Sequence, residues 1–303
     1  MKKICNITID VDTLRSNFKG AGNKNSVYSG IELPEGIERS IDFFKKRDIK
    51  AVYFCVAADF ENGKYSYLLK KLIDNGHEIA SHSYSHPQGF RLLSVTEKKK
   101  EILLSKKLLE DLSDSKIFGF RAPGWNIDDE TMIILKECGY LYDSSIFPTF
   151  IMPALKMMHY MSMKRRTTEE RTTMGLLKYM LYSIEPHITK DKLFEFPIQV
   201  STFLRLPFFA TFYLQYPKLS NYLFSQISHK TFINFQMHLS DFADYYKEPL
   251  RTEFSMTAGS YVSASVSKTL QYKEKCWDNI FDKISQSGYS FITLNSTINS
   301  IKA

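Results

Sequence analysis

Ile4-Cys5-Asn6-Ile7-Thr8-Ile9-Asp10-Val11-Asp12 begins as an apolar run and ends with two carboxylates. An apolar run of this length predicts a buried β-strand. Because successive side chains of a strand point to opposite faces, Asp10 and Asp12 project from the same face at its end. The segment therefore predicts a strand that delivers two neighbouring carboxylates to one place.

Strand-like and helix-like patterns alternate along the rest of the chain. Strands are expected at residues 51–56, 77–81, 117–120, 193–200, 231–238 and 289–294. Helices are expected from about 34 to 48 and at 65–75, 95–112, 128–138 and 269–287, with Asp128 as an N-cap. Repeated β–α units at this spacing predict a parallel sheet or barrel, and we expect one α/β domain over residues 1–303.

Chemically useful side chains fall where these strands end. His82 and His86 follow the strand at 77–81, Arg121 follows 117–120, and His238 ends 231–238. In parallel α/β folds, ligands gather at the carboxyl ends of the strands. Two histidines and one carboxylate are the ligand set of a catalytic divalent metal, most often zinc. The spare carboxylate could activate water, which favours a hydrolase.

Each motif has a structural alternative. Asp-x-Asp also occurs in phosphatases and glycosyltransferases, and a histidine pair can simply be hydrogen-bonded. Pro87 disfavours a helical His86, so we expect the histidines on a loop. Arg121 could orient a carboxylate base and Trp125 could wall a sugar pocket, or they could be a surface ion pair and core filler. His238 stands where a general acid could protonate a leaving amine.

Composition and charge fit a globular protein without a nucleic-acid partner. Hydrophobic residues make up 44% of the 303 positions, and the formal charge of +7 includes no long polybasic tract. The four cysteines are scattered, as expected for free thiols. No run of eighteen apolar residues and no secretory signal is seen, so we expect a cytoplasmic protein.

Residues 150–224 interrupt the β–α pattern with an apolar insert. Residues 151–163 and 174–184 are apolar around most of a helix, and a basic segment, 164–171, separates them. Such helices usually pack in a core or a subunit interface. The functional alternative is a membrane-interfacial element, with basic residues facing lipid head groups.

Taken in order, five motifs resemble the polysaccharide deacetylase family, the NodB-homology domain of carbohydrate esterase family 4. They are residues 8–12, 82–86, 119–125, 140–148 and 235–238. The family usually carries Thr-Phe-Asp-Asp in the first motif, and Asp10-Val11-Asp12 matches a branch with one residue between the carboxylates. Phe235 replaces a usual leucine in the fifth motif. The resemblance implies a distorted (β/α) barrel with fewer than eight regular units.

The resemblance also implies a role for each site residue. Asp10 looks like the catalytic base, Arg121 its tether and His238 the general acid. Asp12, His82 and His86 look like ligands of a divalent metal, Zn²⁺ above all, with Co²⁺, Ni²⁺, Mn²⁺ and Fe²⁺ as alternatives. The expected substrate-binding residues are Pro123, Gly124, Trp125 and Asp143. The Gly124 amide would help to hold the oxyanion, and Asp143 would line the cleft or orient a partner.

The expected substrate is an acylated amino sugar of a cell-envelope glycan or glycolipid precursor. Residues 10–15 and 124–125 resemble lipid-linked aminoarabinose deformylases, although Arg121 and Pro123 depart from them. With the apolar insert, this favours a lipid-linked sugar and peripheral contact with the inner face of the plasma membrane. Deformylation is the main alternative to deacetylation. An aspartate-nucleophile phosphatase, a non-catalytic sugar-binding protein and an iron oxygenase are more distant alternatives.

Overall fold

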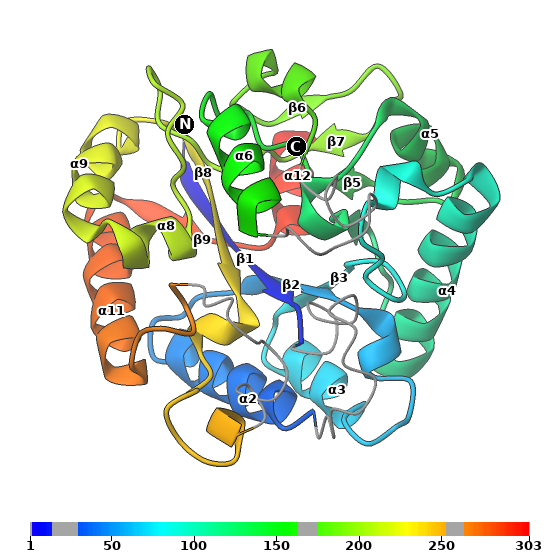
Figure 1. Ribbon diagram of the computed structural model, residues 1–303, viewed down its shortest axis with the longest axis horizontal. Coiled ribbons are helices and arrows are strands. Elements are labelled where there is room, and N and C mark those ends of the chain that lie inside the picture. The colour runs from blue at the N-terminus through cyan, green and yellow to red at the C-terminus, as the bar shows by residue number, and fades with distance from the viewer. Residues whose placement is uncertain (1, 14–29, 163–174, 253–263, 303) are drawn as a thin grey trace.

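A curled, mostly parallel sheet forms the centre of the protein, and helices surround it (Figure 1). The computed structural model describes residues 2–13, 30–162, 175–252 and 264–302. The hydrogen-bonded strand order is β6-β7-β5-β4-β3-β2-β1-β8, and β9 also pairs with β1. The strands are β1 (Lys3–Val11), β2 (Ala51–Cys55), β3 (Glu78–Ser81), β4 (Gly119–Phe120), β5 (Tyr142–Asp143), β6 (His187–Ile188), β7 (Phe194–Glu195), β8 (Phe232–His238) and β9 (Tyr289–Phe291).

Only the β6–β7 pair is antiparallel among the pairings of the described strands. Within the described residues the sheet path ends at β6 and β8, so the barrel is not closed by backbone pairing. A side chain bridges part of this gap, because Asn234 Nδ2 on β8 donates to the carbonyls of Phe196 and Pro197, just after β7. The expected distorted (β/α) barrel is confirmed.

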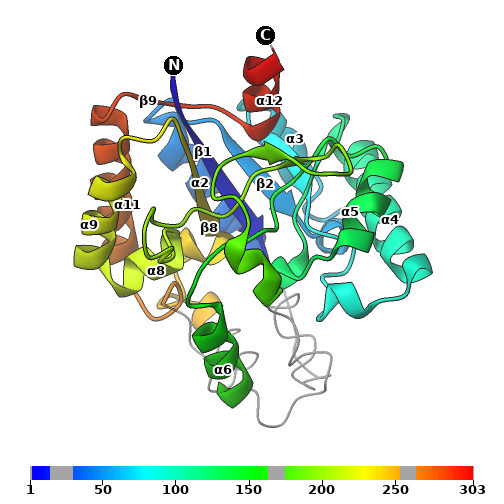
Figure 2. The ribbon, with the colours of Figure 1, turned by 90° about the horizontal axis from the view of Figure 1, so that it is seen from above.

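Helices cover the outer face of the sheet and fill one end of the barrel. The helices are α2 (Glu32–Lys45), α3 (Tyr67–Asp74), α4 (Val95–Ser113), α5 (Asp129–Glu137), α6 (Met152–Ser162), α8 (Ala210–Gln215), α9 (Pro217–Ile227), α11 (Leu270–Gln286) and α12 (Leu294–Lys302). Leu294 and Ile298 of α12 pack with Val52 and Phe54 of β2 in a buried cluster. Figure 2 shows α12 near the N-terminus and α6 projecting from the opposite side.

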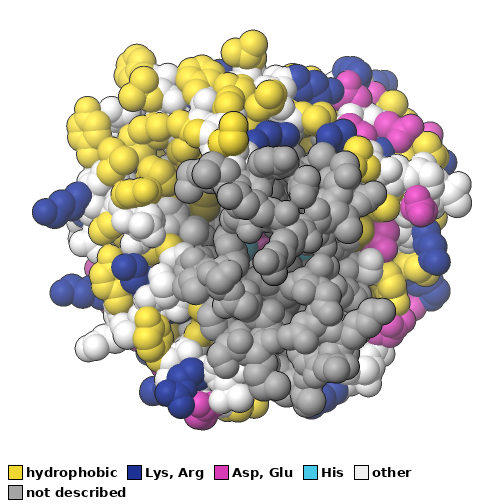
Figure 3. Space-filling view, viewed as in Figure 1, with side chains coloured by type: hydrophobic (Ala, Val, Ile, Leu, Met, Phe, Trp, Pro, Cys, Tyr) yellow, Lys and Arg dark blue, Asp and Glu magenta, His cyan; other side chains and the backbone are white. Residues whose placement is uncertain are grey.

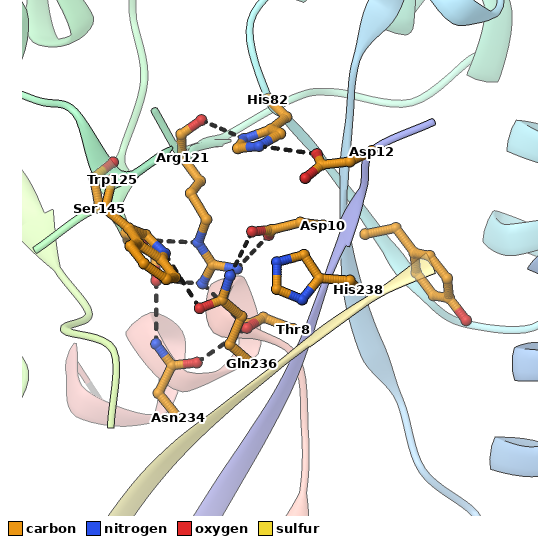
Figure 4. Close-up of polar contacts among 12 residues, drawn as sticks. Thr8, Asp10, Asp12, His82, Arg121, Trp125, Ser145, Asn234, Gln236 and His238 are labelled. Atoms are coloured by element: carbon orange, nitrogen blue, oxygen red, sulfur yellow. Dashed lines mark hydrogen bonds and ion pairs between the residues drawn. The ribbon is translucent and has the colours of Figure 1, made fainter. Parts of the chain in front are cut away.

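The alternation of β1 separates the core from the site. Ile7, Ile9 and Val11 are fully buried in the main hydrophobic core. Thr8 and Asp10 point the other way, into the barrel (Figure 4). The register places Asp10 beside His238 of β8. A single strand therefore anchors the helix layer on one face and supplies polar groups on the other.

Most expected elements are present, with differences near the chain end and in the insert. Asp128 caps α5 by accepting the Thr131 amide, as predicted. The strand expected at 193–200 is only β7, because Pro197 has no amide hydrogen to continue a ladder. The strand expected to reach residue 294 ends at Phe291, and α12 was not predicted. Residues 163–174, which include the Lys164-Arg165-Arg166 cluster, lie outside the described residues.

The insert contributes to the barrel itself. β6 and β7 lie within residues 150–224 and join the same sheet. The helix expected at 174–184 is a short 3₁₀ turn, Leu177–Leu181, within the part described. None of the helices in the described segments has the length and apolar character needed to cross a membrane.

Candidate metal and acid–base site

The candidate site forms where β1, β3, β4 and β8 end (Figure 4). Asp10 and Asp12 come from the end of β1, His82 follows β3, Arg121 follows β4, and His238 ends β8. Parallel neighbours bring their carboxyl ends to the same edge of a sheet, so residues far apart in sequence meet here. The structure brings all five together, as the sequence predicted.

Asp12, His82 and His86 form a compact group of potential metal ligands. One donor atom from each lies within 4.8 Å of the others. Asp12 Oδ1 is 3.2 Å from His82 Nε2 and 3.6 Å from His86 Nε2. Two ligands of a tetrahedral zinc ion stand about 3.3 Å apart, given metal–ligand distances near 2 Å. The spacing of the three side chains therefore fits a single divalent ion.

The tautomer of His82 supports the same fit. His82 Nδ1 lies 2.7 Å from the backbone carbonyl of Arg121, which can only accept, so Nδ1 carries the proton. In the neutral ring, Nε2 then presents a lone pair towards the Asp12 carboxylate, which is also an acceptor. Two acceptors at this distance need either a proton or a metal cation between them. Metal-ligating histidines usually donate their second nitrogen in this way.

The charges of the group favour a cation at the same point. Burial opposes ionisation of Asp12, but attraction to His86 and His82 is stronger and holds the pKa of this carboxyl below its usual range. Burial likewise opposes the charged form of His82, yet the Asp12 and Asp10 carboxylates raise the pKa of His82 above its usual value. The site therefore stabilises positive charge between Asp12 and the histidines.

A tight loop carries the two histidines, and Glu101 of α4 holds it. Ser83 and His86 have positive φ angles of 66° and 55°. Glu101 accepts hydrogen bonds from the backbone amides of Tyr84 and Ser85, and Ser85 Oγ donates to it at 2.7 Å. Three donors on one carboxylate stabilise a turn that is otherwise strained. The predicted loop is confirmed, whereas the supporting role of Glu101 was not predicted.

Both carboxylate oxygens of Asp10 accept hydrogen bonds. Arg121 Nη1 donates to Asp10 Oδ1 at 2.6 Å, and Gln236 Nε2 donates to Asp10 Oδ2 at 2.5 Å. Arg121 is fully buried, and its other guanidinium atoms donate to Thr8 Oγ1, Ser144 Oγ and the Ser144 carbonyl. Arg121 is therefore not the surface ion pair that was the alternative. Its contacts are those of a side chain that fixes a carboxylate.

The segment 123–125 forms a short 3₁₀ turn beside Asp10. Gly124 and Trp125 both have positive φ, near 60°. The Trp125 ring packs against Phe147 and Phe209 with centroid distances of 4.9 and 5.9 Å, and its Nε1 donates to Gln236 Oε1. Trp125 is partly exposed, whereas Pro123 is buried. The indole thus joins an apolar cluster to the polar group around Asp10.

Asp143 contacts a neighbouring residue rather than lining a cleft. It is fully buried, and its two oxygens accept the hydroxyl and the amide of Ser145. Its strand partner is Glu195 of β7, which is also fully buried. Burial and the neighbouring Asp143 raise the pKa of Glu195 well above its usual value, and burial also raises that of Asp143. The pair orders the 143–146 segment, because Glu195 also accepts the Ile146 amide.

His238 is half-buried at the end of β8, and its backbone amide donates to Asp241. Gln236 and Asn234 precede it at intervals of two, so all three point into the barrel. Gln236, Asn234 and Glu195 were not predicted as site residues. The sequence signal for Gln236 and Asn234 was a polar residue at every second position of an otherwise apolar strand.

Comparisons with known proteins find similar sequences among deacetylases. A family model described as polysaccharide deacetylase matches residues 25–142. A peptidoglycan deacetylase of Helicobacter pylori is 29% identical over 144 residues, which is 46% of this chain and 47% of that protein. A peptidoglycan-N-acetylglucosamine deacetylase of Bacillus cereus is 31% identical over 101 residues, 33% of this chain and 45% of that protein. Each match thus spans a little under half of the curated relative.

The fold has counterparts among solved structures. A structure from Mycobacterium smegmatis, assigned to the polysaccharide deacetylases, aligns over 100% of this chain and 91% of that chain, with a TM-score of 0.61. Sequence identity over this alignment is 13%, so the likeness concerns the fold alone.

Proposed function

We propose that this chain, a member of the polysaccharide deacetylase family, is a metal-dependent N-deacetylase that removes the acetyl group of an amino sugar. The observation that carries the proposal is the Asp12–His82–His86 group with the Arg121-held Asp10 beside it. Such a group offers ligands for a metal and a separate base at one site. We assign residues 1–303 to one catalytic unit with 150–224 as an insert.

The proposed roles follow from what each side chain can do. Asp12, His82 and His86 would hold a divalent ion, which would polarise an acyl carbonyl and make water more acidic. Asp10 accepts a proton from the attacking water, and His238 donates one to the departing amine. The Gly124 amide stands in the turn next to Trp125, suited to an oxyanion. Zinc is the metal we propose, because the ligands are two imidazoles and one carboxylate.

The proposed substrate is a cell-envelope glycan or glycolipid precursor bearing an N-acetyl group. The matched Helicobacter and Bacillus proteins are named for peptidoglycan, which supports an envelope amino sugar. The partly exposed Trp125 offers an apolar ring face of the kind that stacks on sugars. The aspartate-nucleophile phosphatase is less suitable, because it has no use for the two histidines clustered with Asp12.

An exposed apolar ridge supports a lipid-linked substrate. We define the apolar ridge by Phe150, Leu177, Leu181, Tyr182, Phe203 and Leu204, of which Leu181 and Phe203 are 81% and 78% exposed. Arg205 ties its segments together by donating to the carbonyls of Met180 and Tyr182. Figure 3 shows hydrophobic side chains gathered over the upper left of the face onto which the strand ends point. Exposed aromatic and aliphatic groups with a nearby guanidinium suit an anionic lipid surface.

Acetate release tests the activity. Purified protein, loaded with zinc and then with each alternative metal, is incubated with N-acetylglucosamine oligomers and with an N-acetylated lipid-linked amino sugar. Release of acetate from either, abolished by a chelator, supports the proposal. Formate release from the matching formamido sugar, without acetate, identifies the deformylase alternative instead.

Liposome flotation tests the membrane part. We expect binding to vesicles with anionic lipid and at least a fivefold loss in the double variant Phe203→Ser/Leu204→Ser, with matched exposed changes Leu103→Ser/Leu104→Ser on α4 as the control. Equal flotation of both variants would remove the apolar ridge as the contact. A location at the inner face of the plasma membrane is the corresponding prediction for cell fractionation.

A further inference from the structure

Gln236 of β8 hydrogen-bonds both to Asp10, the proposed base, and to Trp125, the proposed sugar-binding residue. Its Nε2 donates to Asp10 Oδ2 at 2.5 Å, and its Oε1 accepts the indole Nε1 of Trp125 at 3.2 Å. The register of β1 and β8 places Gln236 beside Thr8, one step along the barrel from Asp10 and His238. Figure 4 shows its amide between the Trp125 ring and the Asp10 carboxylate.

Only one orientation of the Gln236 amide satisfies both neighbours. An indole nitrogen can only donate, and an ionised carboxylate can only accept. The carbonyl of Gln236 must therefore face Trp125 and its NH₂ group must face Asp10, which settles the amide orientation by chemistry. An ionised glutamate at this position would have no proton to offer Asp10. A side chain with both a donor and an acceptor at this reach is required.

Because Gln236 and Asp10 are buried, the loss of the hydrogen bond between them should be costly. Gln236 is fully buried and Asp10 is 3% exposed, so water does not readily replace a lost partner. Arg121 already holds Asp10 Oδ1, and Gln236 is the second support that stops the carboxylate from rotating about its Cβ–Cγ bond. A base must keep one lone pair aimed at the proton it removes, and small misplacements lower the rate strongly.

We propose that Gln236 is a positioning residue that holds the base Asp10 and the sugar-facing Trp125 in one hydrogen-bonded unit. The catalytic part of this inference rests on the proposed deacetylase function, whereas the physical link between Asp10 and Trp125 does not. This unit fixes the distance between a substrate stacked on Trp125 and the Asp10 oxygen that accepts the proton. The unit also explains why this buried strand position carries an amide rather than an apolar side chain.

The first test measures the hydrogen-bonded link from Asp10 through Gln236 to Trp125 and needs no substrate. The chain has two tryptophans, so ¹⁵N-tryptophan labelling gives two indole signals, one from Trp125 and one from Trp277. Trp277 donates to the Asp241 carbonyl and serves as an internal reference. We expect Gln236→Met and Asp10→Ala each to shift the Trp125 signal, which Trp125→Phe identifies. In the Gln236→Met background, Asp10→Ala should no longer shift it.

An unmoved Trp125 signal in Asp10→Ala, or a shift that persists in the Gln236→Met background, overturns the link. Gln199→Met is the matched control, because Gln199 is another buried glutamine whose amide donates to the Val200 carbonyl. It should leave the Trp125 signal in place. If Gln236→Met does not fold, Gln236→Leu carries the same expectations, because a leucine side chain can neither donate to Asp10 nor accept from Trp125.

The second test reads catalysis in zinc-loaded protein. Loss of a buried hydrogen bond to a charged group should lower kcat by about ten- to a hundredfold in both Gln236 variants. Bound zinc per chain should stay unchanged, because Gln236 contacts none of the three ligand side chains. An unchanged kcat overturns the positioning role. If the wild-type protein releases no acetate, the proposed function fails, and the indole signals still decide the link.

Discussion

His82 donates its Nδ1 proton to the backbone carbonyl of Arg121, with 2.7 Å between the two atoms. The turn that supplies the tether of Asp10 therefore also fixes the tautomer of a metal-ligand candidate. In return, the Arg121 amide donates to the Ser81 carbonyl, next to His82. The metal group and the base thus share one backbone junction between β3 and β4. A change in this junction should affect both together.

Asp12→Ala or His82→Ala should remove the metal. Either change takes one of three closely spaced donors and leaves too few protein ligands for tight binding. Elemental analysis after dialysis should find at least a tenfold loss of bound zinc. His229→Ala, at an exposed histidine, is the control and should keep the wild-type content. Stoichiometric zinc in either site variant contradicts the ligand assignment.

Asp10→Asn should keep the metal and lose turnover. The amide preserves the shape of the side chain but has no basic oxygen of the same strength, and a general base contributes about 10²- to 10⁴-fold. Zinc content and kcat, measured on the same preparation, separate the two effects. Near-normal acetate release would exclude Asp10 as the base.

Glu101→Ala should weaken metal binding without touching a ligand. The loop that carries His82 and His86 would lose its three hydrogen bonds to the carboxylate. Changes of this kind in the outer support of a metal site typically cost about 10- to 100-fold in affinity. Competition with a zinc-binding dye measures the dissociation constant. Glu97→Ala, which removes the capping box of the same helix, is the matched control. Equal weakening in both variants would point to helix stability instead.

Glu195→Gln should make the fold more stable at neutral and alkaline pH. The pKa values of Asp143 and Glu195 are raised in the folded state, so folded protein retains protons that the unfolded chain releases. The free energy of unfolding should therefore fall as pH rises from the ordinary carboxyl range through the folded pKa values. Glutamine keeps the oxygen that accepts the Ile146 amide and removes one ionisable group.

Thermal unfolding between pH 4 and pH 9 measures this difference. The Tm of Glu195→Gln should exceed that of the wild type at pH 8, and the two should converge towards pH 4. Asp191→Asn, near Glu195 in sequence but outside the pair, is the control. Parallel curves for Glu195→Gln and the wild type would show that the pair does not titrate between folded and unfolded states.

The sequence predicted those parts of the site that lie at strand ends. Asp10, His82, Arg121 and His238 could be found because a strand pattern has a readable end, and parallel ends converge. Glu101 and Glu195 could not be found this way. Glu101 lies inside a helix with ordinary polar spacing, and Glu195 ends the short strand β7, which the apolar pattern extended to residue 200. Only their long-range contacts distinguish them.

The fold was predicted best where alternation was regular. Helices α4 and α5 and strand β1 agree closely with the expected bounds. The strand expected at 193–200 was too long, because an apolar pattern alone does not show where Pro197 ends the ladder. Helix α12 was missed because its residues, Leu294–Lys302, form a short polar stretch whose two apolar contacts lie inside the barrel.

One face of β1 packs in the hydrophobic core and the other carries Asp10 in the site, so the site forms only when β1 pairs in the correct register. A slip of one residue between β1 and β8 would turn Ile7, Ile9 and Val11 inward and force Asp10 among the helices. Such a misfolded chain would expose apolar groups and bury a charge, so it would be unstable and open to proteolysis. Chains with a misassembled site would therefore be degraded as misfolded protein, because the register that forms the site also forms the core.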